Sequence, residues 1–207
     1  MMEKILFVDA CVRHNSRTRA LAQVVLQNLD GVLEHLPLYE NPLPPLDLRV
    51  MAKRAEAAQS GIYEDPVFAH ALQFAQADVI VIAAPFWDLM FPAVLKNYLE
   101  QITVSGITFR YTEKGIPTGL CRAKKLYYVT TAGGYLGEQN FGFAYVQALA
   151  KGFYGIDDVR CISAQGLDIA GNDANAILEE AKRAAQALQN NEKSESYAGL
   201  ADEGRNN

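Results

Sequence analysis

The amino-acid sequence predicts a doubly wound α/β fold, in which helices cover both faces of a parallel sheet. Short, unbroken apolar runs alternate with longer segments of helical period, which is typical of strands buried on both faces. Half of the 207 residues are hydrophobic and 21% are charged, as in globular proteins. A chain of this length can form a single core, and it contains no internal repeat.

Five apolar runs have the length and composition expected of strands. They lie at residues 4–9, 32–36, 79–84, 125–131 and 160–164. Two segments depart from the alternation of strands and helices. Residues 37–45 are proline-rich and irregular. Residues 106–120 predict an inserted β-hairpin, because their first half alternates in polarity before a turn rich in glycine and proline.

Segments of helical period between the strands predict amphipathic helices that pack on the sheet. In residues 16–29, for example, Leu21 and Val25 share one face. The helix after the third strand is expected to begin near Pro92, because proline is tolerated in a first helical turn. The other expected helices are residues 65–76, 141–151 and 174–188.

The chain becomes polar and poor in large apolar residues after Leu188. Such a segment cannot bury enough surface to offset the entropy of ordering it. We therefore expect one domain at residues 1–189 and a disordered tail at residues 190–207.

Composition excludes several classes of protein. A formal net charge of −5 disfavours nucleic acid or an anionic membrane as a partner. No apolar run approaches the roughly 20 residues needed to cross a bilayer, and the N-terminal residues do not resemble a signal peptide, so we expect a cytoplasmic protein. The three cysteines and three histidines lack the spacings of a disulfide framework or a metal site.

In an open parallel sheet, ligands bind beyond the carboxyl ends of the strands. After the first strand, Ser16 and Thr18 stand where a helix begins, and its free N–H groups together with short hydroxyls suit a phosphate. Three nearby arginines would add Coulomb attraction: Arg13, Arg17 and Arg19. The alternative is that Asn15 or Ser16 only caps the helix and that the arginines are solvated.

Large apolar side chains crowd the loop after the third strand, where a surface loop is usually polar. A planar ring lying against Trp87 would gain about 0.5–1.5 kcal/mol beyond the burial of its surface. The alternative is a hydrophobic lid over the end of the sheet, or a dimer contact.

The loop after the fourth strand contains Gly133 and Gly134, which allow a backbone to approach the edge of a ligand. A tight turn is the alternative. The glycine signatures of dinucleotide and P-loop sites are absent from the sequence. Phosphate donors, an aromatic loop and a glycine-rich rim together describe a mononucleotide with a flat head, and FMN fits that description best.

A set of longer motifs adds to this interpretation. They are AAPFWDLMFPAVLKNYLE (residues 83–100), GITFRYTEKG (106–115), GL (119–120), KK (124–125) and TTAGG (130–134). Together they resemble the FMN-dependent NADH azoreductase and quinone reductase family of the flavodoxin-like superfamily.

The resemblance implies a five-stranded flavodoxin-like sheet of order 2-1-3-4-5 and a homodimer with FMN near its interface. The FMN-binding residues that it implies are Ser16, Arg17 and Thr18 for the phosphate, Phe86, Trp87, Asp88 and Leu89 for the ring, and Thr131, Ala132, Gly133 and Gly134 for the second rim. Three positions depart from the family pattern: Ala10 stands where serine is usual, Trp87-Asp88 replace a Tyr-Asn pair, and Ala132 stands where arginine is common.

The implied reaction is ping-pong. NADH or NADPH passes a hydride to N5 of FMN and leaves, and a flat electron-poor acceptor, such as a quinone or an azo compound, takes its place. The flavin carries the chemistry, so no catalytic side chain is required. The alternatives are a flavodoxin-type electron carrier without nicotinamide turnover and a flavin-free regulatory module on the same fold.

Two further predictions concern single side chains. Phe109 and Tyr111 of the hairpin would shape the acceptor pocket of this subunit or of a partner, with core or interface packing as the alternative. Cys11 is expected to be a small buried filler, with a reactive thiol, whose pKa the helix start and the arginines would lower, as the alternative.

Overall fold

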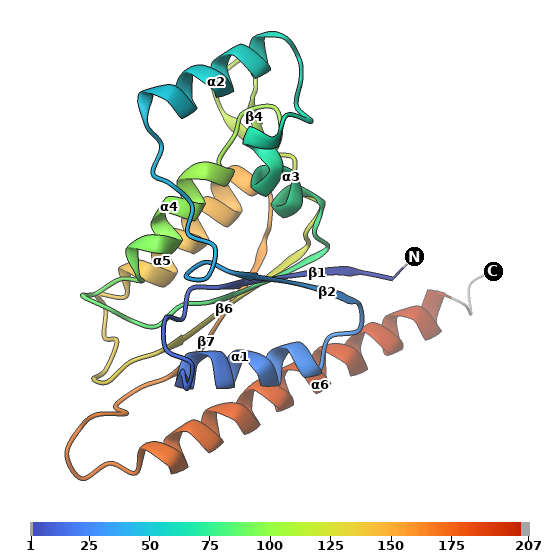
Figure 1. Cartoon of the computed structure of the whole chain (residues 1–207). Coiled ribbons are helices and arrows are strands. Elements are labelled where there is room, and N and C mark those ends of the chain that lie inside the picture. Colours follow the sequence, from blue (N-terminus) through green and yellow to red (C-terminus); the bar gives the residue numbers. More distant parts are fainter. Residues whose placement is uncertain (1, 204–207) are drawn as a thin grey trace.

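The computed structural model describes residues 2–203, with side chains as far as Leu188. At its centre is a parallel five-stranded sheet of order β2-β1-β3-β6-β7 (Figure 1). Its strands are β1 (Lys4–Asp9), β2 (Val32–Pro37), β3 (Val79–Ala83), β6 (Lys125–Thr131) and β7 (Asp158–Ala164). If the two hairpin strands are left out of the count, this order is 2-1-3-4-5. The α/β class and the strand order are therefore confirmed.

Helices cover both faces of the sheet (Figure 1). One face carries α1 (Arg17–Gln27) and α6 (Ala174–Glu203), and the other carries α3 (Ala69–Gln76), α4 (Ala93–Ile102) and α5 (Phe141–Leu149). Alternate residues of β1 enter different cores: Ile5 packs on the α1 side, and Leu6 on the α4 side. Both faces of each central strand are thus buried, which explains why these strands are unbroken apolar runs.

The helix α2 (Leu48–Gln59) was not predicted from the sequence. Among its residues only Ala57 is buried, so it carries no continuous apolar stripe. Asp47 caps its first turn, since its carboxylate accepts a hydrogen bond of 2.7 Å from the Val50 N–H. Alanine, arginine and glutamate, which have high helix propensity, make up much of the rest.

Two predicted helices are divided in the structure. The first comprises a short 3₁₀ turn, η1 (Pro66–Phe68), followed by α3. The second comprises α5 followed by one π-helical turn, η2 (Ala150–Tyr154), which ends at Gly155 in the left-handed region with φ of 75°. In both cases the hydrophobic period continues through the change of helix type, so it does not reveal the division.

The helix α6 extends to Glu203 and so overlaps the segment for which composition predicts a disordered tail. Residues 204–207 lie outside the described part of the chain. The domain boundary at residue 189 stays a prediction.

The inserted hairpin is confirmed, as an antiparallel pair of β4 (Phe109–Tyr111) and β5 (Pro117–Gly119) that stands apart from the main sheet. Its base is fixed by Thr108, whose buried hydroxyl donates to the Ile102 carbonyl at 2.8 Å and accepts from the Val104 N–H at 3.0 Å. The alternation of polar and apolar residues therefore begins at Ile107, two residues before the hairpin strand β4.

The packing of β5 on η2 gives a prediction for stability. A Cβ atom at Gly119 would lie 2.2 Å from the backbone nitrogen of Gly155 and 2.3 Å from the carbonyl oxygen of Tyr154. Because backbone atoms cannot rotate away, Gly119→Ala should lower the free energy of unfolding by about 1–3 kcal/mol. Thermal unfolding followed by circular dichroism measures this. Gly152→Ala is the matched control, because a Cβ there meets nothing within 4 Å, and equal melting temperatures for the two variants would contradict the prediction.

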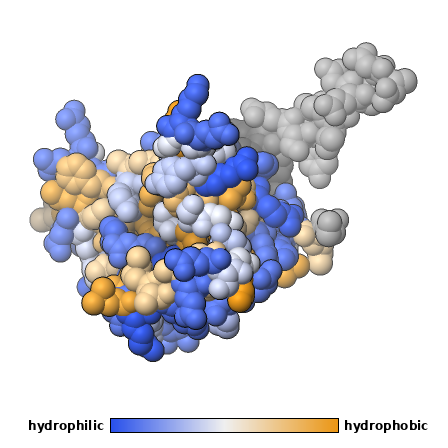
Figure 2. Space-filling model, turned by 90° about the horizontal axis from the view of Figure 1, so that it is seen from above, coloured by the Kyte–Doolittle hydropathy of each residue, from blue (hydrophilic) through white to orange (hydrophobic). Residues whose placement is uncertain are grey.

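The side of the molecule that carries α2 has a surface of mixed polarity. Figure 2 looks down on this side, and its hydrophobic residues form small groups separated by hydrophilic ones. Leu48, Met51 and Ile62 are the large apolar residues exposed on α2 and just after it. No helix within the described residues is both long and apolar enough to span a bilayer.

Candidate functional site

A cavity of about 330 Å³ opens beyond the carboxyl ends of β1, β3 and β6. Its wall consists of residues 12–13, 15–18 and 85–87 together with Thr131, Gly133 and Asp168. The loops that follow four of the five sheet strands therefore meet at one place. Seven of the residues expected to bind a cofactor line this cavity: Ser16, Arg17, Thr18, Phe86, Trp87, Thr131 and Gly133.

The start of α1 lines the cavity. Ser16 caps the helix, with its Oγ accepting a hydrogen bond of 3.2 Å from the Arg19 N–H. The hydroxyls of Thr18 and Thr131 lie 2.6 Å apart, and both residues are buried. Ser16 thus caps α1, its part in binding a phosphate stays a prediction, and Thr18 ties α1 to β6 beneath the site.

Arg17 reaches across the cavity to the loop after β7. Its guanidinium donates a hydrogen bond of 2.9 Å to the Asp168 carboxylate and one of 3.3 Å to the Leu167 carbonyl. The side chain of Arg17 is 36% exposed and that of Asp168 is 65% exposed, so this ion pair faces solvent at the wall of the cavity. Asp168 was not recognised from the sequence, because an isolated aspartate in a polar loop gives no signal of its own.

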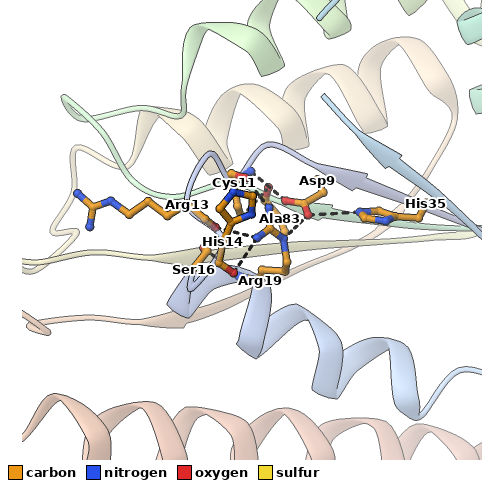
Figure 3. A network of polar contacts seen from close by, with 8 residues as sticks. All are labelled: Asp9, Cys11, Arg13, His14, Ser16, Arg19, His35 and Ala83. Atoms are coloured by element: carbon orange, nitrogen blue, oxygen red, sulfur yellow. Dashed lines mark hydrogen bonds and ion pairs between the residues drawn. The ribbon is translucent and has the colours of Figure 1, made fainter. Parts of the chain in front are cut away.

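Arg19 lies beneath the loop between β1 and α1 rather than in the solvent, as Figure 3 shows. Its Nε donates to Asp9, a fully buried carboxylate at the end of β1, and its terminal nitrogens donate to backbone carbonyls of the loop. Arg13 extends away from this network and is exposed. Of the three arginines expected to attract an anion directly, Arg13 and Arg17 line the cavity and Arg19 does not.

The aromatic loop forms a second wall of the cavity. Trp87 is 41% exposed, and its backbone exchanges two hydrogen bonds with Met90, at 2.9 and 2.8 Å. The turn between them places Asp88 and Leu89 in the left-handed region, with φ of 49° and 66°. Both residues lie outside the cavity lining, and their contact with a cofactor stays a prediction.

The glycine-rich rim contributes Gly133 to the wall, where a Cβ atom would lie 2.5 Å from Oδ2 of Asp168. Ala132 is buried and donates its N–H to the Ala164 carbonyl at 2.9 Å. The carbonyl of Gly134 accepts a hydrogen bond of 2.8 Å from the Gly166 N–H. These two residues fasten the rim to the loop after β7, and their predicted role in binding stays a prediction.

The hairpin aromatics do not line the cavity of their own chain. Phe109 is buried, with its ring 5.0 Å from that of Phe153 and 5.2 Å from that of Tyr111. Tyr111 is exposed. Packing is therefore what the structure shows for Phe109, and a role of the hairpin at a partner subunit's pocket stays a prediction.

Cys11 is a buried filler in this structure. It is 3% exposed, and burial raises the pKa of its thiol from 9.0 to about 12, although a hydrogen bond with Ser16 acts in the opposite direction. The filler interpretation is therefore confirmed: the charge of Arg19 does lower this pKa, but burial outweighs it. Arg19 is held by Asp9 and loop carbonyls, and the charge of Asp9 further raises the Cys11 pKa.

This shift predicts how the thiol reacts. In the native protein, alkylation of Cys11 by iodoacetamide should keep rising about tenfold for each pH unit through pH 10, because the thiolate is the nucleophile and its pKa lies above that range. In urea, the rate should level near the ordinary pKa of 9.0. Mass spectrometry of the peptide gives both rates, and a native rate that levels near pH 9 would refute a buried, neutral thiol.

Comparisons with known proteins agree with the fold. Residues 3–188 match a family model described as flavodoxin-like fold. An FMN-dependent NADH:quinone oxidoreductase from Coprothermobacter proteolyticus is 36% identical over 200 residues, which cover 90% of this chain and 98% of that protein. A protein of the same name from Caldicellulosiruptor bescii is 40% identical over 205 residues and covers the same shares. The crystal structure of an azoreductase from Bacillus anthracis superposes with a TM-score of 0.79 at 26% identity, and covers 92% of this chain and 100% of that one.

Proposed function

This chain belongs to the family with the flavodoxin-like fold, and from that premise we propose that it is an FMN-dependent NAD(P)H oxidoreductase. Its acceptors are quinones, azo compounds or similar flat, electron-poor molecules. The relatives named FMN-dependent NADH:quinone oxidoreductase support this, because they align along almost their whole length. The observation that carries the proposal is a single cavity at the strand ends that combines a basic loop, an exposed tryptophan and a glycine rim.

The residues of the cavity suit the parts of FMN. The loop before α1 and the side chains of Arg13 and Arg17 suit the phosphate, because N–H donors and guanidinium groups both favour an anion. Pro85 and Trp87 offer an apolar wall for the ring system. The volume of about 330 Å³ lies within the range of small-molecule sites.

When bound, FMN supplies the redox chemistry, by accepting a hydride from a nicotinamide and passing two electrons to the acceptor. The chain then has three tasks: to hold the phosphate, to orient the ring and to leave one ring face open to both substrates. Trp87 would orient the ring, and Gly133 would let the backbone approach its edge without a side chain between them. No nucleophilic side chain is needed for these tasks.

We also propose a homodimer in the cytoplasm. Exposed apolar side chains lie on the segments that follow β1, β3 and β6, and a second subunit would cover them. They are Val12, Trp87, Leu89, Tyr135 and Phe141. Analytical ultracentrifugation tests this, and a monomer at micromolar concentration would contradict it.

The chain provides its own probe for the cofactor. Trp87 is the single tryptophan of the sequence and lines the cavity, so FMN should quench its fluorescence on binding. The visible spectrum of the purified protein then shows whether flavin is retained. NADH oxidation in the presence of a quinone tests turnover.

The three outcomes separate the hypotheses. Quenching together with NADH turnover above that of free FMN supports the oxidoreductase. Quenching without turnover indicates an electron carrier. A colourless protein whose Trp87 fluorescence does not respond to FMN indicates a flavin-free module.

A further inference from the structure

We propose that Arg19 is a positioning residue that gives this pocket its preference for a phosphorylated flavin, by holding the loop between β1 and α1 from behind. The inference rests on the proposed function. Arg19 lies outside the wall of this cavity, although it lines a neighbouring hollow with Ser16 and Arg17. Its guanidinium nitrogens are bound to Asp9 and to loop carbonyls, so its effect on the ligand is exerted through the loop.

The contacts of Arg19 converge on one short segment, and Figure 3 shows them together. Its Nη1 donates to the Arg13 carbonyl at 2.7 Å and to the His14 carbonyl at 3.2 Å, and its Nη2 donates to the Cys11 carbonyl at 2.6 Å. Its Nε is held by the carboxylate of Asp9. One guanidinium thus donates hydrogen bonds to three carbonyls of a loop that leads directly into α1.

Asp9 fixes the guanidinium in this place. Its side chain is fully buried and also accepts a hydrogen bond of 2.9 Å from the Cys11 N–H. The ring of His35, stacked on Phe7, approaches the same carboxylate to 3.3 Å. Burial alone would lower the pKa of Arg19, but the hydrogen bond and charge of Asp9 raise it above its ordinary value, so the guanidinium stays charged.

The direction of the carbonyls determines the direction of the amides. In a trans peptide, the C=O of one residue and the N–H of the next point to opposite sides. Because the carbonyls of residues 11, 13 and 14 face Arg19, the N–H groups of Val12, His14 and Asn15 face away from it. These three N–H groups donate to no other group in the described part of the chain. Val12 and Asn15 belong to the cavity wall.

The loop is therefore arranged as a set of outward N–H donors with a fixed positive charge behind them. Neighbouring backbone N–H groups that face the same side of a loop bind anions, above all phosphate. The ring of a bound flavin would instead meet the aromatic loop at Trp87. Removal of Arg19 should thus weaken the binding of FMN and leave that of riboflavin, which lacks the phosphate, unchanged.

Arg19→Met and Arg19→Lys test this, with both ligands titrated by quenching of Trp87 fluorescence. Arg19→Met should bind FMN about 10- to 100-fold more weakly, because the loop loses its charged partner, and riboflavin within about twofold of the wild type. Arg19→Lys should also lose most of the FMN preference, because an ammonium group cannot span four acceptors as a planar guanidinium does. Arg49→Met, which removes an exposed positive charge from α2, is the matched control and should bind both ligands as the wild type does.

Limited proteolysis gives a second readout that needs no flavin. Trypsin should cut after Arg13 faster in Arg19→Met than in the wild type, because the loop is no longer anchored, and inorganic phosphate should protect the wild type more strongly than the variant. If Arg19→Met does not fold, Arg19→Lys replaces it in this experiment and should also be cut faster after Arg13 than the wild type.

Four results would overturn the inference. They are an equal loss of FMN and riboflavin, an unchanged preference for FMN in Arg19→Met, wild-type behaviour of Arg19→Lys, and unchanged cleavage after Arg13. A wild-type protein that binds neither flavin would instead overturn the proposed function together with this inference.

Discussion

Replacement of Trp87 by alanine is expected to weaken the binding of FMN and of riboflavin about 10- to 100-fold, which corresponds to the roughly 1–3 kcal/mol found for stacking a flat base on an aromatic side chain. Trp87 is a half-exposed aromatic of the cavity wall, and its backbone is fixed by two hydrogen bonds to Met90. The ring is thus held in place before a ligand arrives. Because the variant has no tryptophan, isothermal titration calorimetry is the suitable measurement.

Three controls make this prediction specific. Trp87→Phe should recover most of the affinity, since it keeps a flat apolar surface at the same place. Ile62→Ala removes an exposed apolar side chain just after α2, outside the cavity lining, and it should leave both affinities unchanged. Equal melting temperatures would show that the fold is intact. If Trp87→Ala binds both flavins as the wild type does, the aromatic loop does not contact the ring.

The sheet could be predicted from the sequence because its strands are buried on both faces. The runs at β1 and β6 have the predicted bounds, and the others differ by one or two residues at an end. The strand order itself came from the resemblance to a family. Helix α2 could not be found from hydrophobic periodicity, since its stability comes from helix propensity and the Asp47 cap rather than from an apolar face.

The candidate site could be predicted only in part. Residues such as Trp87 and Gly133 stand out because their type is unusual in a surface loop or permits close approach. Asp168 gives no such signal, and it meets Arg17 only because the topology brings together loops 151 residues apart. Arg19 could be recognised as a cation near a helix start, but not as the partner of Asp9, because that pairing depends on how the loop folds back over the end of β1.

The ion pair between Arg17 and Asp168 predicts two variants with opposite effects on FMN binding. Arg17→Gln should weaken FMN binding about 10-fold or more, because it removes a charge-assisted hydrogen bond to the phosphate. Asp168→Asn should strengthen FMN binding about two- to fivefold, because a carboxylate at the wall both repels a phosphate and competes for the guanidinium. Fluorescence titration of Trp87 measures both variants.

Salt and riboflavin separate this electrostatic account from a structural one. Asp168 is 65% exposed, so raising the salt concentration from 0.05 to about 0.5 M should screen its charge and remove most of the gain in Asp168→Asn. Riboflavin has no phosphate, and its affinity should change in neither variant. If Asp168→Asn instead weakens FMN binding as much as Arg17→Gln does, the carboxylate serves to hold Arg17 in its binding position. The two side chains would then act on the phosphate as one unit rather than in opposition.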